Sequence, residues 1–374
     1  MTPRAAVVHE WLTVPGGSEK VALRILGLLG QADLYAAVYR PGAFPELAGT
    51  PVHTTFLDRL PGARSHYQRL LPLMTAAYEQ LDLSPYELVV SSSHSCAKNV
   101  LTPPGTFHLC YCHTPMRHAW EPTKLRDEPI GRLERVLLPS LLARLRRDDL
   151  AGASRVDRFV ANSAHVANRI RKYYRRRAVV VHPPVEVAPF LAAPRSPGDA
   201  YLVVSRLVPY KRVDLAVEAC TRLGRPLVVV GDGRDRERLE ARAGPSVSFL
   251  GHANLPTLVD LMTGSKALLF PGEEDFGMVP VEAQAAGTPV IAYGVGGVRD
   301  SVVDGSTGVL FGDQTVDGLC RAIERFERLA FDPDAARENA ARFAPDRFDR
   351  ELSAVIDEGP EDLPELSEPE ALHA

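Results

Sequence analysis

Two glutamates, Glu274 and Glu282, are the clearest candidates in this chain for binding a polar ligand. An apolar strand is expected to end at Phe270, and a helix is expected to begin near Met278. The first turn of a helix offers free backbone N–H groups and a positive dipole end, and Gly277 lets the backbone approach a ligand closely. Carboxylates accept hydrogen bonds from paired hydroxyls. The segment therefore suits a phosphate that lies next to a polyhydroxyl group.

The simpler interpretation is that both acids only complement the dipole of the helix. An isolated pair at this spacing would leave that interpretation open. Here Phe276 and Gly277 stand between the acids, and the small-residue run 281–287 (VEAQAAG) lets a neighbour pack closely on the helix. These flanking residues favour the ligand site.

A second candidate site follows the expected strand Tyr201–Ser205. Arg206 and Lys211 stand five residues apart after it. Two cations at the carboxyl end of a strand can hold a pyrophosphate from two sides and stabilise the negative charge that builds up on a leaving nucleotide. Alone, such a pair would more often be solvated on the surface.

At these residues the sequence resembles the family-4 retaining glycosyltransferases of the GT-B fold. Their motif E-x-F-G-x-x-x-x-E stands here as residues 274–282 (EDFGMVPVE), and their donor-phosphate motif R-L-x-x-x-K stands as Arg206, Leu207 and Lys211. The resemblance covers nearly the whole chain. It implies that Glu274 binds hydroxyls of the donor sugar and that Glu282 binds the nucleotide ribose.

The same resemblance implies further donor-binding positions. The segment between the two acids, with Phe276, Gly277, Met278 and Val279, would face the donor sugar and phosphate. Two turns would lie beside the nucleotide, and they contain Gly231, Phe249 and Gly251. Gly231-Asp232-Gly233 also begins a dinucleotide fingerprint, but Arg236 stands where that motif needs its third glycine, so NAD binding is not expected.

The N-terminal half contributes a glycine turn and a histidine. Gly16 and Gly17 follow the first expected strand, where backbone amides could approach a phosphate or an acceptor; a Gly-Gly pair alone is usually only a turn. His113 follows the expected strand Phe107–Cys112, and the family places a histidine there against the donor sugar. The run 111–120 (YCHTPMRHAW) resembles bacterial polysaccharide mannosyltransferases, which implies mannose from GDP-mannose.

The resemblance implies a hexosyltransferase that retains the anomeric configuration, and with Arg206 and Lys211 on the phosphate we expect it to need neither a metal nor a cofactor besides its nucleotide-sugar substrate. His113, Arg206, Lys211 and Glu274 are the predicted catalytic residues. Because no carboxylate stands out as a nucleophile, we expect front-side attack, in which the leaving phosphate takes the proton of the acceptor. Two alternatives stay open: a nucleotide-sugar 2-epimerase of the same fold, and an inactive GT-B scaffold.

The elements that must position these residues alternate between short apolar strands and helices. This order predicts two doubly wound α/β, Rossmann-like domains that face each other across a cleft. We expect an acceptor-binding domain at 1–188 and a nucleotide-sugar domain at 200–345. A helix at 346–358 could cross back to the first domain, and 359–374 reads as a disordered acidic tail. The expected strands are Ala5–Val8, Leu88–Ser91, Phe107–Cys112, Arg158–Ala161, Val179–Val181, Tyr201–Ser205, Pro226–Val230, Val247–Leu250, Ala267–Pro271 and Pro289–Tyr293.

Charge is distributed unevenly between the two halves. Residues 1–190 carry 24 Lys and Arg against 16 Asp and Glu, and the rest carries 19 against 31. Two basic stretches, 132–147 and 169–177, could lie on an anionic membrane surface or simply cover a core with solvated arginines. We expect a glycan or polyprenyl-diphosphate-linked acceptor and no nucleic acid. Without an expected signal peptide or spanning helix, we predict a cytoplasmic enzyme that can bind the membrane peripherally.

Overall fold

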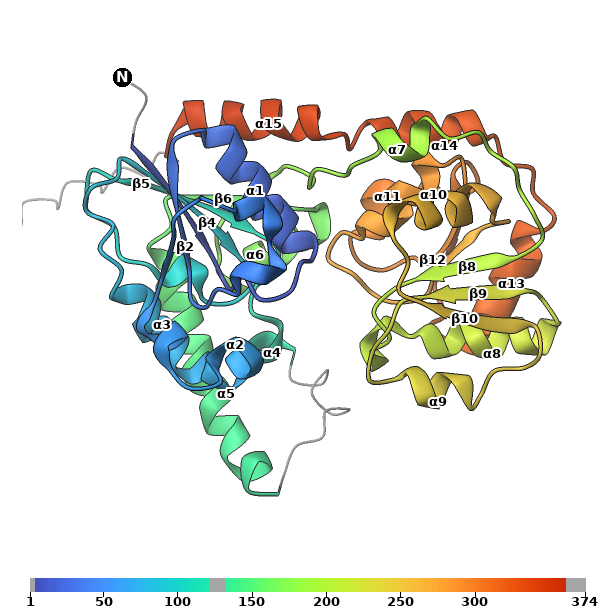
Figure 1. The fold of residues 1–374 in the computed structure, drawn as a ribbon, viewed down its shortest axis with the longest axis horizontal. Helices are drawn as coiled ribbons and strands as arrows, with labels where there is room; N and C mark the ends of the chain where they lie inside the picture. Colours follow the sequence, from blue (N-terminus) through green and yellow to red (C-terminus); the bar gives the residue numbers. More distant parts are fainter. Residues whose placement is uncertain (1–3, 122–131, 361–374) are drawn as a thin grey trace, which may run out of the picture.

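The computed structural model describes residues 4–121 and 132–360, except for the side chains of residues 132–136. It contains two α/β domains, each built around one parallel sheet (Figure 1). The doubly wound, two-domain architecture predicted from the sequence is therefore confirmed.

The N-terminal domain contains a seven-stranded sheet in the order β3-β2-β1-β4-β5-β6-β7. Every strand pair that forms it is parallel. Its strands are β1 (Ala5–His9), β2 (Ala32–Ala36), β3 (Val52–Thr54), β4 (Leu88–Ser93), β5 (Phe107–Cys112), β6 (Arg158–Ala161) and β7 (Val179–Val180).

Both faces of this sheet are covered, which explains why its strands are apolar throughout. Alternate residues of β1 pack into two different cores: Ala5 and Val7 on one side, Ala6 and Val8 on the other. The helices of this domain are α1 (Gly17–Leu29), α2 (Ala63–His66), α3 (Leu71–Glu79), α4 (Arg117–Trp120), α5 (Arg132–Ser154) and α6 (Ala164–Tyr173), with short 3₁₀ turns at 41–43, 45–47, 56–59, 67–70 and 97–99.

The C-terminal domain contains a six-stranded parallel sheet in the order β10-β9-β8-β11-β12-β13. Its strands are β8 (Tyr201–Val204), β9 (Leu227–Val230), β10 (Val247–Gly251), β11 (Leu268–Phe270), β12 (Val290–Tyr293) and β13 (Gly308–Phe311). Its helices are α7 (Ala188–Leu191), α8 (Val213–Leu223), α9 (Arg236–Glu240), α10 (Leu255–Gly264), α11 (Met278–Ala285), α12 (Val298–Ser301), α13 (Val316–Phe326) and α14 (Pro333–Ala341), and a 3₁₀ turn spans 209–211.

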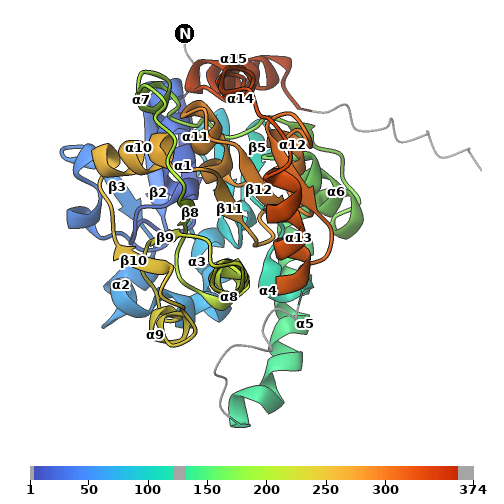
Figure 2. The same cartoon turned by 90° about the vertical axis from the view of Figure 1, so that its right-hand side faces the viewer.

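The last helix, α15 (Pro345–Glu358), ties the two domains together. It follows the C-terminal domain in sequence but lies along the N-terminal domain (Figures 1 and 2). Its residues Phe348, Leu352 and Val355 are buried in the same core as Val7 of β1. From residue 361 on, the tail that we expected to be disordered lies outside the described residues.

The structure also contains elements that the sequence did not reveal. Strands β2, β3 and β13 were not predicted, since each is short or carries polar residues within an apolar run. Helix α5 continues through Pro139 in its interior. Helix α7 lies at the boundary between the two domains expected from the sequence, where no element was predicted.

Candidate functional site between the two domains

The loop between β11 and α11 carries the two candidate acids. Gly277, directly before α11, has a backbone φ of +87°, which favours glycine. A Cβ atom at this position would lie 3.0 Å from the ring of Phe270. Because Gly277 has no side chain with which to cap α11, the first N–H groups of the helix remain available to a ligand.

The N-terminus of α1 approaches α11 from the other domain. A Cβ atom on Gly17 would lie 3.2 Å from the sulfur of Met278, the first residue of α11. Two helix N-termini from different domains therefore meet at one place, which concentrates positive potential there. This arrangement can bind an anion such as a diphosphate.

Glu274 and Lys211 form an ion pair at this place. Both side chains are mostly buried, at 15% and 18% exposure. A narrow pocket between the ends of β8 and β11 is lined by both residues. Arg206, at the same end of β8, is exposed and donates a hydrogen bond of 2.9 Å to the hydroxyl of Tyr210. A bound phosphate could thus take the place of Glu274 beside Lys211, and a sugar hydroxyl could take the place of Lys211 beside Glu274.

Glu282 lies within α11 and is half-buried. Burial raises the pKa of Glu282 above its ordinary value, and the positive charge of Lys20 on α1 partly offsets this effect. A buried carboxylate whose pKa is raised gains from a hydrogen-bond donor, and a ribose hydroxyl would supply one.

Two glycines shape the neighbouring turn after β9. Gly231 adopts a φ of +125°, and its N–H donates a 2.7 Å hydrogen bond to the carbonyl of Gly251. A Cβ atom on Gly231 would collide with the carbonyl oxygen of Ser205. The rings of Phe249 and Phe276 pack against the cores of the C-terminal domain, so these two positions can offer only backbone groups to a ligand.

His113 comes from the N-terminal domain, directly after β5. Its Nε2 lies 2.8 Å from the hydroxyl of Ser92, and its carbonyl accepts a hydrogen bond from Asn162. Burial, with the neighbouring His94 and His9, lowers the pKa of His113 to about 3. It is therefore a neutral imidazole at physiological pH, suited to orienting a hydroxyl rather than to neutralising a phosphate.

Asp275, the residue after Glu274, contacts the N-terminal domain across the cleft, which no local sequence pattern predicted. Arg117 and Arg169 from the N-terminal domain donate hydrogen bonds of 2.6 and 3.0 Å to its two carboxylate oxygens. The hydroxyl of Ser163 donates to its backbone carbonyl. Although burial acts to raise it, the two guanidinium groups hold the pKa of Asp275 below its ordinary value. We call Asp275, Arg117 and Arg169 the interdomain clamp.

Comparison with known families gives two matches that together span most of the chain. Residues 193–343 match the family described as glycosyl transferases group 1, and residues 15–188 match glycosyltransferase family 4. The Anabaena protein Alr3699/HepE, solved in complex with UDP and glucose, has a TM-score of 0.69 at 16% identity, over 95% of this chain and 99% of that one. This chain belongs to the family-4 GT-B glycosyltransferases.

Other relatives of this GT-B chain are glycosyltransferases of several kinds. Sucrose-phosphate synthase from Thermosynechococcus elongatus has a TM-score of 0.68 at 19% identity, over 96% of this chain and 99% of that one. Glycogen synthase from Mycobacterium tuberculosis is 34% identical over 43% of this chain and 41% of the relative. D-inositol 3-phosphate glycosyltransferase from Gordonia bronchialis is 31% identical over 54% and 51%. The chain thus spans about half the length of the curated relatives it matches.

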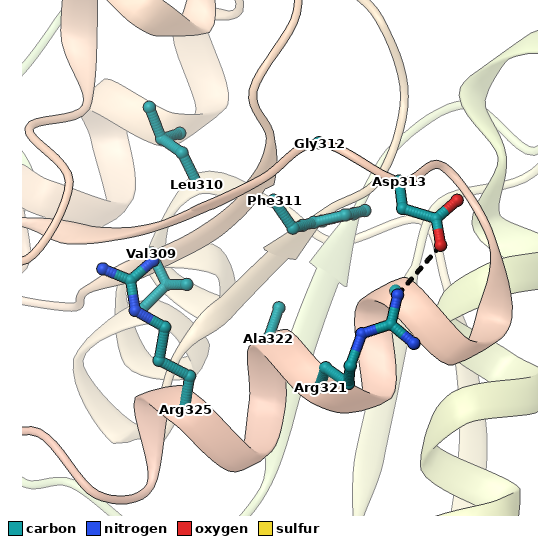
Figure 3. Close-up of a pocket in the computed structure, with 9 residues that line it drawn as sticks. Val309, Leu310, Phe311, Gly312, Asp313, Arg321, Ala322 and Arg325 are labelled. Atoms are coloured by element: carbon teal, nitrogen blue, oxygen red, sulfur yellow. Dashed lines mark hydrogen bonds and ion pairs between the residues drawn. The ribbon is translucent and has the colours of Figure 1, made fainter.

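A separate hollow lies at the edge of the C-terminal sheet of this GT-B chain, between β13 and α13 (Figure 3). Its arginines are already paired: Arg321 with Asp313 at 2.9 Å, and Arg325 with Asp304 at 3.0 Å. None of the residues predicted from the sequence lines this hollow. The predicted residues lie instead at α1, at α11 and its preceding loop, and at the ends of β5, β8, β9 and β10.

Proposed function

We propose that this chain is a retaining glycosyltransferase that transfers a hexose from a nucleoside-diphosphate sugar to an acceptor hydroxyl. The observation that carries the proposal is the meeting of two helix N-termini, those of α1 and α11, beside Lys211 and Glu274. This geometry offers positive charge to a diphosphate and a carboxylate to an adjacent sugar in one place.

In the proposed reaction, Lys211 and Arg206 bind the diphosphate and stabilise the charge that develops on it. Glu274 and the neutral His113 orient hydroxyls of the sugar, and Glu282 binds the ribose. The acceptor oxygen forms a bond to the anomeric carbon as the bond from that carbon to the phosphate oxygen breaks. The leaving phosphate takes the acceptor proton on the same face, so the anomeric configuration is retained and no metal or cofactor is required.

The donor we propose is GDP-mannose. Its support is the likeness of the run 111–120 to bacterial polysaccharide mannosyltransferases, and Arg117 of that run contacts Asp275, the residue after Glu274. A solved structural neighbour contains UDP and glucose, so the identity of the base and sugar needs a direct test. For the acceptor we propose a glycan or polyprenyl-diphosphate-linked hydroxyl that is bound by the basic N-terminal domain.

The first experiment measures binding of GDP-mannose, UDP-glucose, UDP-N-acetylglucosamine and GDP-fucose by calorimetry, and the release of nucleotide from each. We expect one donor to bind in the micromolar range. Lys211→Ala should weaken that binding by about 10- to 100-fold, since it removes a charge-assisted contact worth about 1.5–3 kcal/mol. Lys172→Ala, which alters an exposed lysine on α6, is the matched control and should bind normally.

The alternatives give different results in the same experiment. Release of the free nucleoside diphosphate supports transfer, whereas conversion of the donor into an isomeric nucleotide sugar supports an epimerase. If no donor binds, or if Lys211→Ala binds as well as the wild type, the proposed donor site is wrong and the inactive scaffold becomes the better interpretation.

A further inference from the structure

Three histidines gather in the N-terminal domain where β1, β4 and β5 end. His9, His94 and His113 have ring centroids 6.4–6.5 Å apart. His9 is fully buried, and neither the sequence nor the proposed reaction gives it a role. Its surroundings determine where its protons must lie.

Both ring nitrogens of His9 lie next to oxygen acceptors, and Nδ1 also lies next to the Ser92 hydroxyl, which can donate or accept. Nδ1 lies 3.2 Å from the carbonyl oxygen of Ser92, and Nε2 lies 3.6 Å from a carboxylate oxygen of Glu19. Burial acts to raise the pKa of Glu19, but the contact with His9 outweighs it and lowers that pKa to about 2. Because a lone pair on Nε2 would face a carboxylate and a lone pair on Nδ1 would face a carbonyl, these neighbours favour a proton on both nitrogens. At 3.6 Å the contact with Glu19 is an ion pair rather than a hydrogen bond.

The hydroxyl of Ser92 lies between His9 and His113 and links the protonation of one ring to that of the other. Its oxygen lies 3.1 Å from Nδ1 of His9 and 2.8 Å from Nε2 of His113. Since His9 donates on its side, the hydroxyl is free to donate its own hydrogen to Nε2 of His113. The opposite order would need a lone pair on Nδ1 of His9, directed at the carbonyl of Ser92. His113 must then carry its single proton on Nδ1.

Glu19 also connects this chain of contacts to the glycine turn. The hydroxyl of Ser18 donates a 2.9 Å hydrogen bond to Glu19, and a Cβ atom on Gly16 would lie 2.7 Å from the same carboxylate oxygen. The N-terminus of α1, which we assign to the diphosphate, is thereby joined to the histidine that we assign to the sugar.

We propose that Glu19, His9 and Ser92 are positioning residues that hold His113 in its Nδ1–H form, so that it donates this hydrogen to a hydroxyl oxygen of the donor sugar. The proposal rests on the proposed function for its ligand, but not for its protonation states. Within the described part of the chain, no protein group hydrogen-bonds to Nδ1 of His113, so this atom is available for the sugar.

Other charged groups also face this cluster. Burial lowers the pKa of His94 below its ordinary value and outweighs the opposing charges of Glu10 and Glu19. His94 therefore adds no competing cation. Asp275 approaches from the C-terminal domain and acts to raise the pKa of His113, an effect that burial outweighs. Neither contact changes the donor and acceptor roles that the Ser92 oxygens impose on His9.

The test uses the full chain with ¹⁵N-labelled histidine and two-bond ¹H–¹⁵N NMR at pH 7.5, with signals assigned through His9→Asn and His113→Asn. We expect His9 doubly protonated and His113 protonated on Nδ1. Glu19→Gln should shift His9 toward a neutral ring. Ser92→Ala should leave His113 with mixed tautomers and lower kcat about 10-fold with little change in donor KM, which corresponds to one hydrogen bond of about 1.4 kcal/mol.

The matched control is Ser91→Ala on the same strand. Ser91 contacts His108 at 2.8 Å, so this variant removes an equally buried serine hydroxyl from a different histidine. Its His113 signals and kinetics should match the wild type. A wild-type His9 that is neutral, or a His113 protonated on Nε2, overturns the proposal. The spectra need neither donor nor turnover, so they remain decisive even if the proposed function fails.

Discussion

Replacing Asp275 with Asn should open the cleft without unfolding either domain. The carboxylate of the interdomain clamp is 16% exposed, and its partners Arg117 and Arg169 are 20% and 7% exposed. Removing one member of a buried ion pair costs about 3–5 kcal/mol when the partner charge is left uncompensated. Arg117 loses Asp275, whereas Arg169 keeps an ion pair with Glu121 at 2.7 Å. We take the lower end, about 3 kcal/mol, because the site is not fully dry.

Both arginines belong to the N-terminal domain and Asp275 to the C-terminal domain. The substitution therefore destabilises the arrangement in which the two domains are in contact, which we call closed. In an open arrangement the arginines regain water. About 3 kcal/mol then corresponds to a roughly 100-fold shift of the closed-to-open ratio. Another contact between the domains, in which Asp300 accepts from the backbone of Ala164 and lies 3.2 Å from His182, is retained in the variant.

The assay is small-angle scattering, combined with energy transfer between one label in each domain. We expect Asp275→Asn to increase the radius of gyration and to weaken donor binding, while the melting temperature changes little. Asp304→Asn removes an exposed ion pair with Arg325 within one domain and should change neither quantity. The double variant Arg117→Gln/Asp275→Asn should be less impaired than the sum of the single variants. Unchanged scattering with a lower melting temperature would refute the clamp and leave only a local structural contact.

Two further predictions concern pH and membranes. Burial lowers the pKa of His108 to about 4 and that of His113 to about 3, so the folded chain binds fewer protons than the unfolded chain below about pH 6.5. The free energy of unfolding, measured by denaturant titration, should therefore fall by about 2 kcal/mol per histidine from pH 6.5 to 5. This range lies above the pH at which carboxylates lose their contribution. His108→Gln should make the free energy of unfolding depend less steeply on pH, and an unchanged dependence would contradict this origin. Phe56, Leu60 and Leu73 are exposed apolar residues, and Arg59 and Arg69 are exposed nearby in the sequence. We expect this surface to bind membranes, so sedimentation with vesicles should show binding that requires anionic lipid and weakens in high salt. Equal binding to neutral vesicles, or no binding, would reject this contact.

Much of the fold could be predicted because parallel strands buried on both faces have a distinctive sequence. The runs at 107–112 and 158–161 are apolar, short and bounded by polar residues, and the structure places strands at the same limits. Edge strands lack this signal: β3 is Val52–Thr54, lies at the end of its sheet and buries none of its residues fully. The described helices include none long and apolar enough to span a membrane.

The site likewise contains residues that local spacing could predict and contacts between residues far apart in the sequence that it could not. Lys211 and Glu274 could be proposed from spacing, because each follows a recognisable strand. The clamp could not, because Arg117 and Arg169 lie 158 and 106 residues from Asp275 along the chain. Similarly, Ser92 and His9 are 83 residues apart. The pairs with Asp275 depend on how the two sheets face each other, whereas His9 and Ser92 are brought together by the pairing of β1 with β4 in one sheet.

These distant contacts also explain why one short loop matters so much. Glu274, which we assign to the sugar, and Asp275, which contacts both arginines, are consecutive residues, and successive side chains in an extended segment point in different directions. One residue can therefore face the ligand while the next faces the other domain. Separation of the domains removes both arginines from Asp275 and, with them, a restraint on the loop that carries Glu274. Closure of the cleft and alignment of the donor are then one event, and donor binding should fall in proportion to domain opening across a series of clamp variants.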